Sequence, residues 1–144
     1  MDILLLSLDL GSPPSSGNVQ DRMHWTQERK LINEWKKRVW IASNGKLFPP
    51  PREDELRKVT LIWEASKGDH PDEDNARRAA KRCIIDLLKR RVRRKMPDGS
   101  RVEIPGLLPI LWDDDVAHCK IEYRPMISKR KNLTVEIRIE STVD

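Results

Sequence analysis

The segment 76–88 constrains the fold more than any other part of the sequence. Its apolar residues recur at three- and four-residue spacing, and they are Ala76, Ala79, Ala80, Cys83, Ile84, Leu87 and Leu88. This spacing places them on one face of an α-helix and leaves the other face to basic residues. We therefore predict a helix whose apolar stripe packs against a sheet and whose basic side is exposed.

Other segments show the apolar content or two-residue alternation typical of strands. We predict strands at residues 2–10, 58–65, 117–123 and 133–139, and a helix capped by Thr26 that runs to about Ala42. The last two strands are joined by a short polar link, which predicts an antiparallel hairpin. The order β-α-β-α-β-β indicates one α+β domain over residues 1–144, with one sheet and helices packed on a face. A basic, turn-rich extension is expected at about residues 90–110.

Basic charge is concentrated in one part of the chain. The net charge is +5, and between Arg77 and Arg101 eleven Lys and Arg residues stand against two acids, a local balance of +9. Such a patch is typical of nucleic-acid binding. The residues expected to contact DNA are Arg77, Lys81, Arg82, Arg90, Arg91, Arg93, Arg94, Lys129, Arg130 and Lys131. The last three also suit a solvated turn.

Cysteine use and hydropathy indicate where the protein acts. Cys83 and Cys119 fall on apolar faces, so we expect buried free thiols, which suit the cytoplasm. No apolar run reaches the roughly 18 residues of a membrane helix. The opening residues carry an acid where a signal peptide has basic residues. We predict a cytoplasmic protein with no membrane partner.

A first acidic cluster opens the basic helix. Asp72 and Asp74 stand at its expected start, where a carboxylate commonly caps the first turn. A cap requires only one carboxylate, and a bound divalent cation would relieve the repulsion between two. Capping and metal binding therefore remain alternative interpretations of this cluster.

A second acidic cluster, Asp113–Asp115, precedes the third strand. Three adjacent acids usually form a solvated turn, but Asp115 borders an alternating strand that would fix its direction. If the helix start and the strand start meet at one end of the domain, four carboxylates come together. Asp72, Asp74, Asp114 and Asp115 would then hold Mg²⁺, with Mn²⁺ as a substitute, and activate water for phosphodiester hydrolysis.

These motifs resemble those of a known family. D-x-D-N (Asp72–Asn75) opening an Ala-rich helix, followed by "WDDD" before a strand pair, is similar to the RusA-type Holliday junction resolvases of phages and prophages. The first strand, "PPSSGN", "HW" and the basic helix after them agree with it. The resemblance implies a homodimeric, Mg²⁺-dependent endonuclease that nicks opposed strands of a four-way DNA junction in the bacterial cytoplasm.

The resemblance also implies roles for individual residues. The essential aspartates map onto Asp72, Asp74 and the acidic pair before the last two strands, where Asp115 is favoured and Asp114 comes next. The family's catalytic helix lysine is replaced here by Arg78, which can neutralise a phosphate but is a poor proton donor.

Two other functions are compatible with the same residues. In one, the chain is a non-catalytic DNA-binding or regulatory protein whose acids only cap the helix. In the other, it is an assembly protein whose basic helix binds an acidic partner. The five tryptophans are expected to pack in the core or at its edge rather than to stack on bases, with Trp112, which directly precedes the acids, as the one exception.

Overall fold

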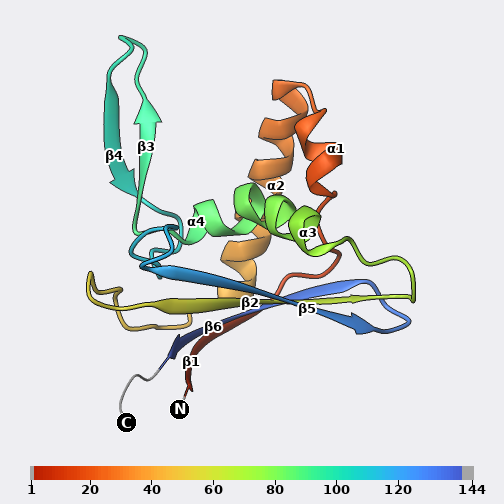
Figure 1. Cartoon of the computed structure of the whole chain (residues 1–144). Coiled ribbons are helices and arrows are strands. Elements are labelled where there is room, and N and C mark those ends of the chain that lie inside the picture. Colours follow the sequence, from red (N-terminus) through yellow and green to blue (C-terminus); the bar gives the residue numbers. More distant parts are fainter. Residues whose placement is uncertain (1, 141–144) are drawn as a thin grey trace.

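A four-stranded sheet with helices over one face is the centre of the computed structural model, which describes residues 2–140 (Figure 1). Its strand order is β1-β6-β2-β5. These strands are β1 (Asp2–Asp9), β2 (Arg57–Ala65), β5 (Cys119–Ile127) and β6 (Asn132–Glu140). The helical elements are α1 (Gly17–Asp21), α2 (Trp25–Ser43), α3 (Glu73–Ala80), the π-helical turn η1 (Lys81–Ile85) and α4 (Asp86–Leu88). The predicted α+β class is confirmed.

A separate two-stranded hairpin leaves the body of the domain at the end of α4. It consists of β3 (Arg91–Lys95) and β4 (Arg101–Pro105), paired antiparallel. Figure 1 shows it rising from the helix-covered side of the sheet without a second layer of its own. The basic extension expected at residues 90–110 therefore takes the form of a projecting β-hairpin.

The two C-terminal strands run in opposite directions across a short link, as predicted, but β2 lies between them. β2 pairs antiparallel with β6 on one side and parallel with β5 on the other. Parallel neighbours require a crossover connection, and here the helical segment from α3 to α4 supplies it. The sequence β2, helix, β5 is therefore a βαβ unit, in which the helix runs opposite to both strands.

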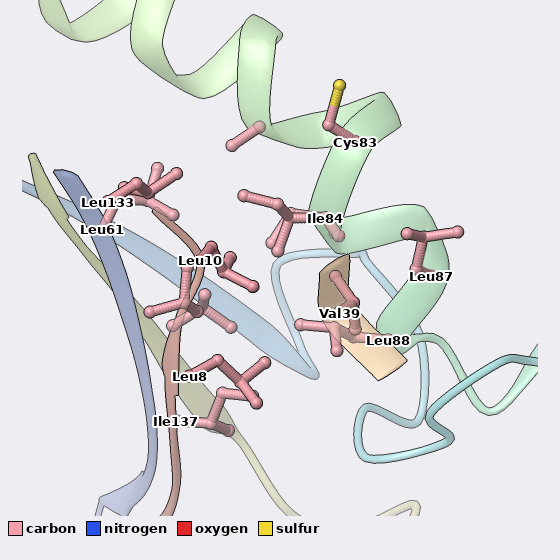
Figure 2. Packing of buried hydrophobic residues seen from close by; sticks show 14 of the residues in the cluster. Leu8, Leu10, Val39, Leu61, Cys83, Ile84, Leu87, Leu88, Leu133 and Ile137 are labelled. Carbon is pink, nitrogen blue, oxygen red and sulfur yellow. The ribbon is translucent and has the colours of Figure 1, made fainter. Parts of the chain in front are cut away.

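The core lies between the sheet and this crossover helix. All seven apolar residues of the predicted stripe, from Ala76 to Leu88, are buried. Figure 2 shows Ile84 and Leu88 on the side of the helix toward Leu8 and Leu61 of the strands, while Cys83 points away from them. Both cysteines are free and buried, as expected, and burial raises the pKa of each thiol to about 12.

The N-terminal helices differ from the prediction in two details. His24, not Thr26, caps α2, since its Nδ1 accepts the backbone N–H of Thr26. The short helix α1 lies between the first predicted strand and the helix predicted from Thr26, where no helix was predicted. Ser16 caps it by accepting a hydrogen bond from the backbone N–H of Val19, and turn-type residues such as Ser commonly serve as caps.

A buried arginine fixes the proline-rich loop before β2. Arg57 is 1% exposed, and its guanidinium donates to Glu55 Oε1 at 2.6 Å and to the carbonyls of Pro49, Pro50 and Ile110 at 2.8–2.9 Å. One side chain thus holds two loops against the end of the sheet. Among residues 2–140, no helix has the length and apolar character needed to cross a membrane.

Candidate nucleic-acid interface and acidic clusters

The first acidic cluster forms the start of α3. Asp72 is the N-cap: its Oδ1 accepts the backbone N–H of Asn75 at 2.8 Å. This confirms the capping interpretation for Asp72. Asp74 lies in the first turn with its side chain 80% exposed, and its Oδ2 meets Arg78 Nε at 3.1 Å. The carboxylate of Asp72 is therefore engaged in capping the helix, whereas the carboxylate of Asp74 is open to solvent on one side.

The second acidic cluster is held by different partners. Asp114 Oδ2 lies 3.0 Å from Lys81 Nζ and 3.7 Å from Lys89 Nζ. Partial burial raises the pKa of Asp114, but the two lysines outweigh it and the pKa is lowered overall. Asp115 instead accepts a hydrogen bond from His118, whose other ring nitrogen contacts the carbonyl of Glu53.

His118 thereby ties the turn before β5 to the loop before β2. Partial burial lowers its pKa, but the hydrogen bonds to Asp115 and Glu53 and the nearby carboxylates prevail, so the pKa of His118 is raised. The protonated ring can donate to both oxygens at once. We therefore interpret the Asp115–His118 pair as a clamp between two loops.

The two acidic clusters do not form one site, contrary to the prediction. Lys81, which binds Asp114, follows Asp72 by nine residues, or roughly 13 Å along a helix. At the other end, Tyr123 in the middle of β5 donates to the carbonyl of Pro71, just before α3. The reason is the βαβ unit: a crossover helix starts at the carboxyl ends of its strands, whereas Asp114 precedes the amino end of β5.

The four carboxylates predicted to bind Mg²⁺ are divided between these two positions, with Asp72 and Asp74 at the start of α3 and Asp114 and Asp115 before β5. Within the described residues 2–140, no three side chains of His, Cys, Asp or Glu are grouped so that they could hold a metal ion. The predicted catalytic residue Arg78 lies with the first cluster, where it binds Asp74 and also Asp21 of α1 at 2.6 Å.

The basic side chains of the crossover helix are neutralised by ion pairs. Arg77 meets Glu73 at 2.9 Å, and Arg82 meets Asp21 at 3.4 Å. Lys81 is shared between Asp86 and Asp114. The helix predicted to be a phosphate-binding surface therefore carries much less free positive charge than its sequence indicates.

The β3–β4 hairpin has the opposite character. Arg93, Arg94, Lys95 and Arg101 are exposed. Over residues 2–140, none of these four makes an ion pair, whereas Arg91 approaches Glu103 at 4.0 Å. Lys95 and Arg101 even face each other directly across the two strands. Lys95 and Arg101 were missing from the predicted DNA-binding residues. The "PDG" turn between two segments with β-branched residues could have indicated the hairpin.

The base of the hairpin is firmly attached to the domain. The Arg90 guanidinium stacks on Trp112 at 3.7 Å from the ring centroid, so Arg90 serves this junction. Gly106 packs so closely that an added Cβ would lie 1.9 Å from the carbonyl oxygen of Lys89. At the tip, Asp98 accepts two hydrogen bonds from Ser100. These contacts give the hairpin a defined direction.

The remaining predicted DNA contacts lie in the link between β5 and β6. Arg130 pairs with Glu64 at 3.1 Å, while Lys129 and Lys131 are exposed. Figure 1 shows this link at the end of the sheet away from the hairpin. The predicted phosphate contacts are therefore distributed over two distant parts of the domain.

Comparisons with family models, curated proteins and solved structures find no match to this chain.

Proposed function

We propose that the protein binds double-stranded, branched DNA through the β3–β4 hairpin. The observation that carries this proposal is a projecting, well-anchored hairpin with four exposed cations that form no ion pair within residues 2–140. Arg93, Lys95 and Arg101 lie on one face of the hairpin, which also carries Glu103 opposite Arg93, and Arg94 lies on the other face. Like charges directly opposite each other, as at Lys95 and Arg101, destabilise a hairpin by several tenths of a kcal/mol. A phosphate backbone lying along the hairpin removes that repulsion and releases its own counterions.

The dimensions of the hairpin suit duplex DNA. Each strand has five residues, which corresponds to roughly 17 Å in extended conformation. A two-stranded ribbon fits the major groove, which is about 12 Å wide. Contacts between these cations and phosphates position a protein on the DNA backbone and carry little sequence information. The hairpin therefore favours recognition of DNA shape over recognition of base sequence.

Binding is tested with a labelled synthetic four-way junction and a linear duplex of the same base composition, in EDTA. We expect the junction to bind more tightly, with an affinity that falls steeply as salt is raised. Equal, salt-insensitive binding of both would contradict the proposal. Absence of DNA binding together with capture of an acidic protein would favour the assembly function instead.

A second candidate function is Mg²⁺-dependent cleavage of four-way junctions by a homodimer in the bacterial cytoplasm. Its support is the resemblance together with the exposed carboxylate of Asp74 beside Asp72. Mg²⁺ is commonly bound by one or two carboxylates and substrate phosphates, so these two acids could suffice without the second cluster. Paired symmetric nicks in the junction on addition of Mg²⁺ would establish this function, and Asp74→Asn should then abolish them. Binding without nicks would leave a DNA-binding protein.

A further inference from the structure

An exposed stripe along α2 combines aromatic and basic side chains. Trp25, Arg29, Ile32, Lys36 and Trp40 follow one another at three- and four-residue spacing, so they lie on one side of the helix. We call these five residues the α2 stripe. Trp25 is 61% and Trp40 60% exposed, so the expectation that every tryptophan packs in or beside the core is wrong for these two.

The charge of α2 is unbalanced around this stripe. Its two glutamates are already engaged, Glu34 with Arg38 at 2.8 Å and Glu28 with Arg82 at 3.7 Å. Among the described residues, the exposed cations of the stripe and its flank take part in no ion pair; they are Arg29, Lys30, Lys36 and Lys37. The guanidinium of Arg29 lies only 5.2 Å from the ring centroid of Trp25. The helix thus presents free positive charge next to exposed indole rings.

The surface of the stripe is also hollowed. A shallow groove of about 290 Å³ is lined by Trp25, Arg29, Ile32 and Lys36 of the stripe, together with Asn33 and Glu28, whose carboxylate is paired with Arg82. From Trp25 to Trp40 the stripe covers fifteen helical steps, which is roughly 22 Å of helix. A flexible chain can follow such a track, with flat groups against the indoles and charged groups against the cations.

We infer that the α2 stripe binds single-stranded nucleic acid. Unpaired bases stack on exposed aromatic rings in a sequence-tolerant manner, while nearby cations hold the phosphates. Paired bases in a duplex do not present their faces, so a duplex would gain nothing from Trp25 and Trp40. A second copy of this chain is disfavoured because its own α2 would bring four more unpaired cations to the contact. The site is separate from the β3–β4 hairpin, and the inference does not depend on duplex binding there.

The test is a fluorescence anisotropy titration of a labelled oligothymidylate of about 20 nucleotides, a length above most single-domain site sizes. The double variant Trp25→Ala/Trp40→Ala should bind at least about 20-fold more weakly than the wild type, because each lost stack removes a severalfold factor. The variant Trp25→Phe/Trp40→Phe keeps aromatic faces and should stay within about threefold. Ile41→Ala, which removes a side chain 73% exposed on another side of α2, is the matched control and should bind normally.

Three results would overturn the inference. The first is that the wild type does not bind the oligothymidylate, and the second is that the alanine variant binds it as tightly as the wild type. The third is that the wild type sediments as a dimer and the alanine variant as a monomer. The last would show that the stripe is a contact between copies. The same titration is carried out in the background of the hairpin variant Arg93→Gln/Arg94→Gln/Arg101→Gln. If the α2 stripe is a separate site, adding Trp25→Ala/Trp40→Ala to this variant should still lower its affinity for the oligothymidylate.

Discussion

Neutralising three arginines of the β3–β4 hairpin is the most direct test of the proposal that this hairpin binds DNA. Arg93→Gln/Arg94→Gln/Arg101→Gln removes three exposed cations that have no carboxylate partner in the described chain. Each phosphate contact contributes about −0.9 to the slope of log affinity against log salt, so the slope should become shallower by about 2.7. When salt is raised from 50 to 200 mM, the affinity of the wild type should therefore fall by a factor roughly 40 times larger than the affinity of the variant.

The matched control removes the same charge from the crossover helix. Arg77→Gln/Lys81→Gln/Arg82→Gln also lowers the net charge by three, but each of these residues is engaged with a carboxylate. We expect its salt slope to change by less than about 1. Both variants are titrated by anisotropy against the labelled four-way junction in EDTA. Equal slopes for the two variants, or a larger change in the control, would refute the assignment of binding to the hairpin.

Three further changes test the framework that supports these surfaces. Arg57→Met should lower the free energy of unfolding, measured in urea, by about 3–5 kcal/mol, because it leaves a carboxylate and three carbonyls without their donor. The control Arg52→Met removes only an exposed ion pair and should lower it by at most about 1 kcal/mol. Gly106→Ala should displace the hairpin base, because a Cβ at this position has no room beside Lys89, and should therefore weaken junction binding. Unchanged affinity would contradict this. His118 has a raised pKa, so its stabilising contribution is complete below about pH 6.5 and is lost as pH rises through the folded-state value. Urea unfolding at several pH values should show His118→Gln to be most destabilising in acid, and a uniform effect would argue against the clamp.

Hydrophobic periodicity was sufficient to predict the four strands of the main sheet, the helix α2 and the crossover helix, but not α1 or the strands of the β3–β4 hairpin. Val59, Leu61 and Trp63 of β2 and the stripe of the crossover helix are buried as expected, because spacing along one chain determines which residues share a face. The neighbour of each strand depends on tertiary packing instead. Nothing in the alternation of β5 and β6 indicates that β2 is inserted between them. That insertion creates the βαβ unit and separates the two acidic clusters.

Charge could be counted from the sequence, but its pairing could not. The crossover helix and the hairpin are both strongly basic, yet Arg82 finds Asp21, a residue on the unpredicted helix α1. Such partners come from elements distant in sequence. Exposure of Trp25 and Trp40 likewise depends on how far α2 projects beyond the core. The functional surfaces therefore depend on tertiary contacts to a greater degree than the fold class does.

Arg78 shows how these contacts change the interpretation of a predicted catalytic residue. Its guanidinium donates to Asp74 at 3.1 Å, Asp21 at 2.6 Å, Asn18 at 3.0 Å and Asn75 at 2.7 Å. Two of these partners belong to or adjoin α3, and two belong to α1. All three guanidinium nitrogens are therefore used to join the two helices. A lysine has a single nitrogen and cannot reproduce this fork geometry.

A structural role and a catalytic role for Arg78 predict different results. With a structural role, Arg78→Lys and Arg78→Ala should both lower the melting temperature by several degrees, corresponding to roughly 1–2 kcal/mol for a partly exposed network. Arg77→Ala, which removes one exposed pair, should change it little. With a catalytic role in Mg²⁺-dependent cleavage, alanine should lose about 10²–10³ in rate while lysine restores it. We expect the first pattern, because neither lysine nor alanine can supply the set of contacts by which Arg78 joins α1 and α3. A lysine variant with the melting temperature of the wild type would contradict the structural role. It would favour a role of Arg78 in binding a phosphate of the substrate.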